Sequence, residues 1–143
     1  MYRKLKDEIA DGIQRGRISS PITSEEARRL PYLQACICEG MRMMPTGLIG
    51  FAKKVPPEGD IICGKPVPGG TEIFANMWDM LRDKDVFGAD AHVFRPERFV
   101  DCEEEKGVHL LKHVELIFGY GRWMCPGQNL AKTELNKIFV EVS

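Results

Sequence analysis

The segment Phe118–Gln128, FGYGRWMCPGQ, is the stretch of the sequence from which the fold can be assigned. Its only cysteine, Cys125, lies between Gly121 and Gly127 and directly before Pro126. The glycines allow tight turns and a close approach of the backbone to a flat or bulky group. The pattern after Pro126 predicts a helix, whose N-terminal dipole and free N–H groups favour a thiolate over a thiol. The segment therefore predicts a shielded thiolate at the start of a helix.

The neighbours of Cys125 leave three interpretations to weigh. A lone cysteine is usually a small buried hydrophobic residue. A nucleophilic cysteine normally needs a histidine base, and none of the three histidines stands in a recognisable relation to it. The loop does not form the dinucleotide pattern GxGxxG, because Met124 occupies the place of the third glycine. A ligand to haem iron fits best, since it needs a sulfur on a tight loop with a flat apolar approach, here Phe118 and Trp123.

The resemblance then becomes specific, because the spacing of the loop is similar to the haem-binding motif of the cytochromes P450. The matching pattern is Phe118-Gly119-x-Gly121-x-x-x-Cys125-x-Gly127. The resemblance implies that Cys125 is the axial ligand of haem b iron and that the other four residues shape the loop under the porphyrin.

One loop position departs from the family pattern. The residue two before the cysteine is normally Arg, which contacts a haem propionate, and here it is Trp123. Similar loops occur in fungal P450s that resemble pisatin demethylase. Lys53 stands where the family often has a propionate-binding Arg, and Arg122 is a second cation next to Trp123. The resemblance therefore implies that Trp123 and Lys53 belong to the cofactor-binding residues.

Two upstream motifs extend the resemblance. In CEGMR, Glu39 and Arg42 share one face of a predicted helix, opposite its apolar stripe, and taken alone they indicate a surface ion pair worth about 0–1 kcal/mol. They resemble the family's ExxR motif, and FRPERF resembles its PERF motif, which contributes Arg98. The resemblance implies a structural Glu–Arg–Arg triad of Glu39, Arg42 and Arg98. Loss of one member of such a buried cluster costs about 3–5 kcal/mol.

The expected fold is mainly α with a small antiparallel β-sheet. In the terms of the family it is the C-terminal portion of the P450 fold: K helix, β1 hairpin region, meander, cysteine loop and the start of the L helix. Patterning predicts helices over 2–15, 23–30 and 31–44, with an apolar stripe of Leu33, Ile37, Met41 and Met44 on the third. Strands are predicted within 48–56, 60–64 and 71–77, one or two helical turns within 78–88, an irregular segment over 89–117 and a helix after Pro126. The apolar face of that helix is assigned to Leu130, Leu135, Ile138 and Phe139.

Composition excludes several classes of protein. The 143 residues suit one domain, and a net charge of -1 with scattered Lys and Arg gives no basic face for nucleic acid. Five irregularly spaced cysteines favour reduced intracellular thiols over a disulfide framework, and no apolar run is long enough for a membrane segment. The acidic run 101–105 is interpreted as a solvated loop, and the pair His109 and His113, which lacks a third metal ligand, as a solvated helical pair.

The resemblance also implies a function for the parent enzyme. It would be a haem-thiolate monooxygenase that hydroxylates or O-dealkylates a small organic substrate, using O2 and electrons from NADPH through a cytochrome P450 reductase at the endoplasmic reticulum membrane. No catalytic residue is identified, because the family's acid–alcohol pair lies upstream of every motif here. Residues 1–143 are expected to form a partial P450 domain truncated at both ends, since the first helix begins without a cap and the last one ends without a C-terminal signal. The alternatives are a non-catalytic haem-binding or unfolded product, and a P450-type isomerase that needs no reductase.

Overall fold

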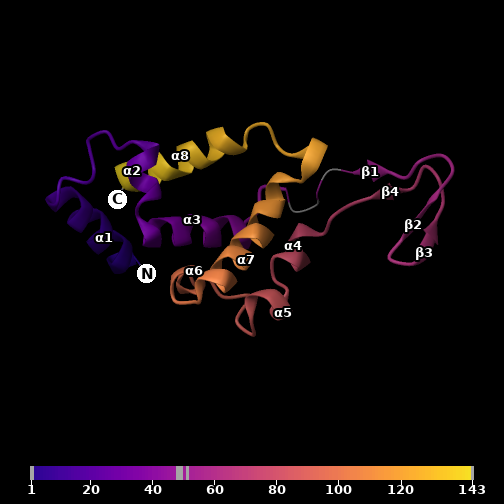
Figure 1. Ribbon diagram of the computed structural model, residues 1–143, viewed down its shortest axis with the longest axis horizontal. Coiled ribbons are helices and arrows are strands. Elements are labelled where there is room, and N and C mark those ends of the chain that lie inside the picture. Colours follow the sequence, from indigo (N-terminus) through magenta and orange to yellow (C-terminus); the bar gives the residue numbers. More distant parts are fainter. Residues whose placement is uncertain (1, 48–49, 51, 143) are drawn as a thin grey trace.

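The computed structural model describes residues 2–47, 50 and 52–142, and its described part is mainly helical with two short antiparallel strand pairs, as predicted. A helical body holds both ends of the chain, and the strands extend away from it (Figure 1). The helices are α1 (Tyr2–Gln14), α2 (Ser24–Arg28), α3 (Pro31–Met43), α4 (Met77–Met80), α5 (Lys84–Phe87), α6 (Glu97–Val100), α7 (Glu104–Glu115) and α8 (Gln128–Glu141). Two 3-10 turns, η1 (Leu116–Phe118) and η2 (Gly121–Trp123), lie between α7 and α8.

Helices α2 and α3 begin where local chemistry predicts. Thr23 caps α2 in a capping box with Glu26, and Pro31 is the first residue of α3. No side chain caps Leu30 at the start of α3, but the carboxylate of Glu8 accepts hydrogen bonds from the first free amides, those of Tyr32 and Leu33, each at 2.9 Å. Helix α1 thereby fixes the start of α3 through a long-range contact.

The core consists of two hydrophobic clusters on either side of α3. One cluster joins α1, α2, α3 and the side chain of Leu135 on α8; its buried members are Ile9, Ile22, Ala27, Leu30, Leu33 and Ile37. The other lies between α5 and α7; its buried members are Leu81, Phe87, Ala91, Leu110 and Val114. Met41 packs against both clusters, which makes α3 the central helix of the body.

The strands form two separate pairs. β1 (Lys53–Lys54) pairs with β4 (Glu72–Ile73), and β2 (Asp60–Ile62) pairs with β3 (Lys65–Val67). The KPV segment was expected to be a turn and is instead β3, because the two-residue turn at 63–64 places it opposite DII. Cys63 and Gly64 have positive φ there, as a tight hairpin turn requires. The expected apolar strand over 48–56 lies partly outside the described residues.

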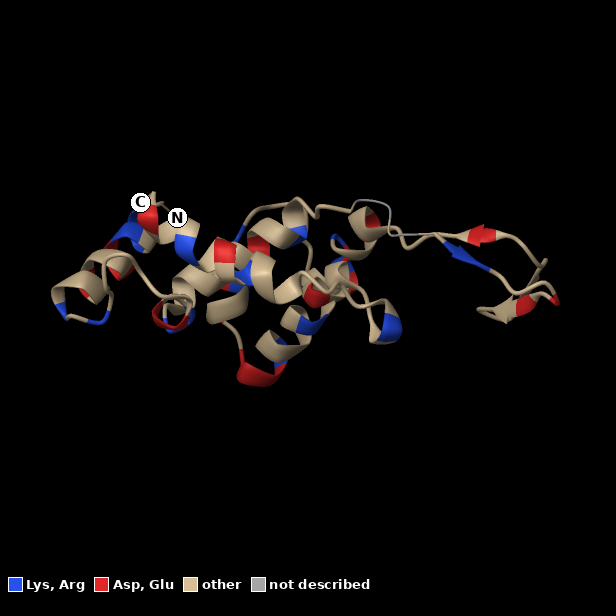
Figure 2. Ribbon diagram, turned by 90° about the horizontal axis from the view of Figure 1, so that it is seen from above, with Lys and Arg blue, Asp and Glu red and all other residues tan. Residues whose placement is uncertain are grey.

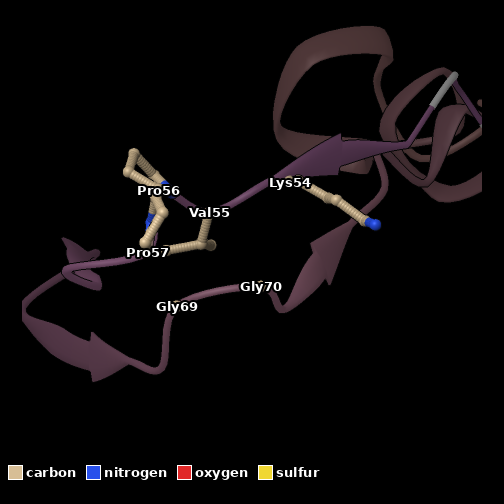
Figure 3. A pocket seen from close by; sticks show the side chains of 6 residues that line it. All are labelled: Lys54, Val55, Pro56, Pro57, Gly69 and Gly70. Atoms are coloured by element: carbon tan, nitrogen blue, oxygen red, sulfur yellow. The ribbon is translucent and has the colours of Figure 1, made fainter.

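A hollow at the root of the β2–β3 hairpin is lined by Lys54, Val55, Pro56, Pro57, Gly69 and Gly70 (Figure 3). A Cβ at Gly69 would lie 2.2 Å from the carbonyl oxygen of Pro57, so glycine allows the two backbones to approach. The lining is mostly proline and backbone with a single cation, and it offers no convergent set of polar groups. The hollow therefore is not the candidate functional site.

Three sequence-based expectations are wrong in detail. The segment 89–117, expected to be irregular, contains α6 and α7, because Gly107, Leu110 and Val114 are buried on one helical face although Gly107 has a low helix propensity. The acidic residues Glu104 and Glu105 are solvated, but they form the first turn of α7. Met44, assigned to the apolar stripe of α3, caps its C-terminus and is 77% exposed.

The apolar face expected for α8 is mostly uncovered. Leu135 packs against the first cluster, whereas Leu130 is 65% exposed and Ile138 and Phe139 are also exposed. Positions of both charge signs are scattered over the helices and strands (Figure 2). Within residues 2–142, in the part that the structure describes, no helix combines the length and apolarity needed to cross a bilayer.

Candidate functional site

The structure brings Glu39, Arg42 and Arg98 into direct contact. Arg42 donates two parallel hydrogen bonds to the Glu39 carboxylate, from Nε to Oε2 at 2.7 Å and from Nη2 to Oε1 at 2.8 Å. Arg98, on α6, donates from Nε to Oε1 at 3.0 Å. The residues are 0%, 0% and 4% exposed, so the ion pair on α3 lies inside the protein and not on its surface. The face opposite the apolar stripe is buried because α6 and the segment before it cover it.

Both arginines use their other N–H groups on backbone carbonyls. Arg42 Nη1 donates to Leu81 O at 2.7 Å and to Ala91 O at 2.6 Å, and Arg98 Nη1 donates to Phe87 O at 2.7 Å. Among the described residues, no buried side-chain nitrogen or oxygen lacks a hydrogen-bond partner. The cluster therefore holds α3, α6 and the segment 81–93 together.

The Glu39 carboxylate stays ionised although it is buried. Burial alone would raise its pKa, but hydrogen bonds from Arg42, from the Arg95 amide at 2.7 Å and from Arg98 hold the pKa below its ordinary value. The charge of Arg42 acts in the same direction. The cluster is thus a fully bonded ionic unit, with one anion between two cations.

Sequence reasoning missed Asp90, which extends this cluster toward solvent. Its carboxylate pairs with Arg95 at 2.6 Å and with Arg98 Nη1 at 3.3 Å. Burial opposes ionisation, but the two arginines lower the pKa of Asp90 from its ordinary value. A lone aspartate in the segment FGADAHVF gave no sign of this contact, because its partners follow five and eight residues later.

The cysteine loop turns back on itself through one backbone bond and two glycines. The Cys125 amide donates to the carbonyl oxygen of Phe118 at 2.6 Å. Gly119 has φ 78° and ψ -174°, a conformation open almost only to glycine, and a Cβ there would lie 2.5 Å from Trp123 O. Gly121 has φ 58°, whereas Gly127 is the N-cap of α8 with an ordinary φ of -85°.

Cys125 is exposed, so the prediction of a shielded thiolate is wrong for this chain by itself. It lies two residues before the N-cap of α8, close to the helix start as expected. The residues beside it do not cover it: Trp123 is 57% exposed, and Tyr120 and Met124 are also exposed. An exposed thiol therefore lies in a loop with three exposed large side chains.

Trp123 contacts two cations, of which Lys53 joins the loop to the strand region. Lys53 Nζ lies 3.9 Å from the centroid of the indole ring, and the Arg122 guanidinium carbon lies 4.9 Å from it. Lys53, on β1, is 70 positions earlier in the sequence, so this contact is long-range. The indole ring thus has two cations beside it, and these are the residues, Lys53 and Arg122, that the sequence analysis named around Trp123.

The predicted site residues fall into two groups built from different elements. Glu39, Arg42 and Arg98 lie between α3 and α6, and the loop residues 118–127 lie between α7 and α8 with Lys53 beside them. In the described part of the chain, no three His, Cys, Asp or Glu side chains are arranged to hold a metal ion. A metal centre formed by protein ligands alone is therefore not found there.

Known proteins match this chain over nearly its whole length. The family model "Cytochrome P450" matches residues 1–142. Cytochrome P450 monooxygenase ABA1 of Pyricularia oryzae is 43% identical over 143 residues, 99% of this chain and 28% of the relative. Cytochrome P450 monooxygenase aba1 of Botryotinia fuckeliana is 47% identical over 142 residues, again 99% of this chain and 28% of the relative.

A solved structure agrees with the sequence relatives. A zebra fish cytochrome P450 solved with progesterone superimposes with a TM-score of 0.75 at 27% identity, covering 98% of this chain and 30% of that one. The chain thus spans less than a third of the length of these proteins. The resemblance stated from the cysteine loop, ExxR and PERF segments is confirmed: the chain belongs to the cytochrome P450 family.

Proposed function

We propose that residues 1–143 form the part of a P450 domain that holds haem on the side of its thiolate ligand, with Cys125 as that ligand. The observation that carries the proposal is the exposed Cys125 thiol on a loop closed by the Phe118–Cys125 backbone bond and shaped by Gly119. Gly121 and Gly127 complete the loop. When bound, haem would supply an iron centre whose thiolate ligand favours O–O cleavage.

The residues around Cys125 fit haem on chemical grounds. A thiolate is a soft ligand suited to iron, and the exposed Tyr120, Trp123 and Met124 offer apolar surface that a flat macrocycle could cover. Lys53 and Arg122, both against the Trp123 ring, offer positive charge for carboxylates at the rim of the ligand. Phe118, at the start of the loop, adds a further aromatic ring.

The buried ionic cluster has a supporting role in this proposal. Glu39, Arg42 and Arg98 touch backbone carbonyls and one another, so they act as positioning residues that fix α3 against α6. Helix α7 packs against both of these helices and leads directly into the cysteine loop. The cluster would therefore keep the loop in place without contacting haem.

For the full-length protein we propose a monooxygenase that hydroxylates or O-dealkylates a small organic molecule. The relatives named above are fungal P450 monooxygenases, and this supports the reaction class. Transfer of electrons from NADPH through a P450 reductase, and residence at the endoplasmic reticulum membrane, belong to the same proposal. Substrate recognition is left to the rest of the protein, since the chain spans 28% of its relatives' length.

The proposal is tested by loading the chain with haem, reducing it and adding carbon monoxide. We expect the strongly red-shifted Soret band of a thiolate-ligated haem. Cys125→Ala should abolish the red shift. Cys63→Ala is the matched control, because Cys63 is also exposed but lies in the turn between β2 and β3. It should leave the spectrum unchanged.

Two outcomes would count against the assignment. A red-shifted band that survives Cys125→Ala would show that another residue ligates the iron. A wild-type chain that takes up no haem would show that these 143 residues do not hold the cofactor without the remainder of the protein. Repeating the substitution in a full-length relative would then separate the ligand assignment from the autonomy of this chain.

A further inference from the structure

Helix α7 carries two histidines that the proposed haem site does not use. His109 and His113 are one helical turn apart, and their ring centroids lie 4.4 Å apart with the planes tilted by 55°. His109 is exposed and His113 is half-buried, so both rings are accessible. The spacing of the two histidines alone favours a solvated pair. The structure adds a hydrogen bond and a ring contact of His113, which the spacing could not predict.

One hydrogen bond fixes the free nitrogen of His113. Its Nδ1 lies 2.9 Å from the backbone carbonyl oxygen of His109. A carbonyl oxygen only accepts, so Nδ1 carries the proton, and in the neutral ring Nε2 keeps its lone pair. Histidines that bind metals almost always donate their other ring N–H in this way, to a carbonyl or a carboxylate. His113 therefore already has the tautomer of a metal ligand.

The His113 ring is also held by packing. The His113 and Phe87 rings make a T-shaped contact, with centroids 6.4 Å apart and planes at 84°. A preorientated ring loses little conformational freedom when it binds an ion. Acidic and basic side chains both neighbour the pair on α7: Glu105 lies one turn before His109, Lys106 lies three positions before it, and Lys112 is next to His113.

We propose that His109 and His113 form a two-imidazole surface site for a divalent transition-metal ion, with Zn²⁺, Cu²⁺ and Ni²⁺ as the class of ligand. Imidazole nitrogen suits these ions, whereas Mg²⁺ and Ca²⁺ prefer oxygen ligands. Since no cluster of three protein ligands is found among the described residues, water would complete the coordination. A bound ion would link two successive turns of α7 and stabilise this helix, because it binds the folded state.

Zn²⁺ titration calorimetry on the 143-residue chain tests the site. Cys63 and Cys125 are replaced by Ser in the background, because their exposed thiols would compete for zinc. We expect one ion per chain. His113→Ala should weaken binding by at least about tenfold, since the second imidazole acts at high effective concentration once the first is engaged. His92→Ala, which removes the one histidine outside α7, should change nothing.

A rearranged variant controls for composition and folding. Leu111→His combined with His113→Leu keeps every residue type but places the imidazoles two positions apart, on different faces of α7. The rearranged variant should lose zinc affinity as His113→Ala does. In the background chain without the rearrangement, Zn²⁺ should raise the midpoint of thermal unfolding and Mg²⁺ should not. The proposal is overturned if that chain binds no zinc, or if the rearranged chain binds it equally well.

Discussion

At the scale of single residues, Glu39 is a side chain whose removal should be costly. It is fully buried and it is the shared anion of Arg42 and Arg98. Glu39→Ala leaves two buried guanidinium groups without their counter-charge, so we expect the free energy of unfolding to fall by about 3–5 kcal/mol. Urea titration followed by circular dichroism measures the loss.

Glu25→Ala is the matched control for Glu39→Ala. Glu25 also pairs with an arginine on its own helix, Arg29 at 3.0 Å, but both side chains are exposed. Its removal should change stability by no more than about 0.5 kcal/mol. Equal effects of the two substitutions would show that the buried cluster contributes no more than a surface pair.

Lys53 and Lys54 provide a residue-scale test of the charge gathered at Trp123. They are neighbours on β1, so their side chains point to opposite faces, and Lys53 reaches the indole ring while Lys54 lines the hollow of Figure 3. Lys53→Ala should weaken haem binding roughly two- to fivefold, because it removes one of the two positive charges offered to the carboxylates of the ligand, and an exposed ion pair is worth up to about 1 kcal/mol. Lys54→Ala should leave the affinity unchanged in the same haem titration. A larger loss with Lys54→Ala would contradict the assignment of Lys53.

At the scale of elements, α3 depends on α1 for its start. Leu30 offers no capping side chain, and Glu8 supplies the acceptor instead through bonds to Tyr32 and Leu33. Glu8→Ala should therefore lower the free energy of unfolding by about 1–2 kcal/mol, the usual cost of a lost N-cap. Asp7→Ala, at the preceding exposed position on α1, should change it by less than about 0.5 kcal/mol in the same urea titration. If Glu8→Ala left the free energy of unfolding unchanged, α3 would form without this cap.

Elements with local signals could be predicted from the sequence. Thr23 and Glu26 form a capping box in the sequence as in the structure, and Pro31 opens α3. Helix α7 was missed because it has no capping side chain at Glu103 and contains Gly107, so its helical state rests on burial of Leu110 and Val114. Tertiary packing decides such a segment, and packing partners are not visible in local spacing.

The same distinction applies to the candidate site. The spacing of Glu39 and Arg42 predicts that they share a helix face. Burial of that face depends on the segment that contains Leu81, Phe87 and Ala91. The backbone carbonyls of these residues accept bonds from the two arginines, and no sequence motif predicts those bonds. The position of Cys125 near a helix start was predicted, whereas its exposure was not. Shielding of the Cys125 thiol from solvent depends on the groups that cover it, and the side chains of the loop do not cover it.

At the scale of the whole molecule, contacts between distant segments tie the helical body together. Glu141 at the end of α8 accepts a hydrogen bond from the Ile22 amide at 2.8 Å, next to α2. Glu97 on α6 accepts bonds from Lys4 on α1 at 2.8 Å and from the Tyr32 hydroxyl on α3 at 2.9 Å. Residues near both ends of the chain therefore bond to segments that are distant in the sequence, and Figure 1 shows both ends at the helical body.

The Glu97 junction makes the stability of the body depend on pH. The hydrogen bond from Lys4 is the main cause that lowers the pKa of Glu97 to about 2, and burial together with this carboxylate raises the pKa of Tyr32 to about 12. A carboxyl group whose pKa is lower in the folded state stabilises the protein above its unfolded pKa. That contribution is lost as the pH falls from about 4.5 to about 2.

Glu97→Gln should remove this part of the acid sensitivity. At pH 7 the variant should be less stable than the wild type, and the difference should shrink steadily as the pH falls from about 5 to about 2, because the wild-type carboxylate then becomes protonated as well. Thermal midpoints followed by circular dichroism at each pH measure it. Glu25→Gln, which removes an exposed carboxylate from a surface pair, should follow the wild-type curve. A stability difference between Glu97→Gln and wild type that stays constant over this range would show that the junction acts through packing rather than through the charge of Glu97.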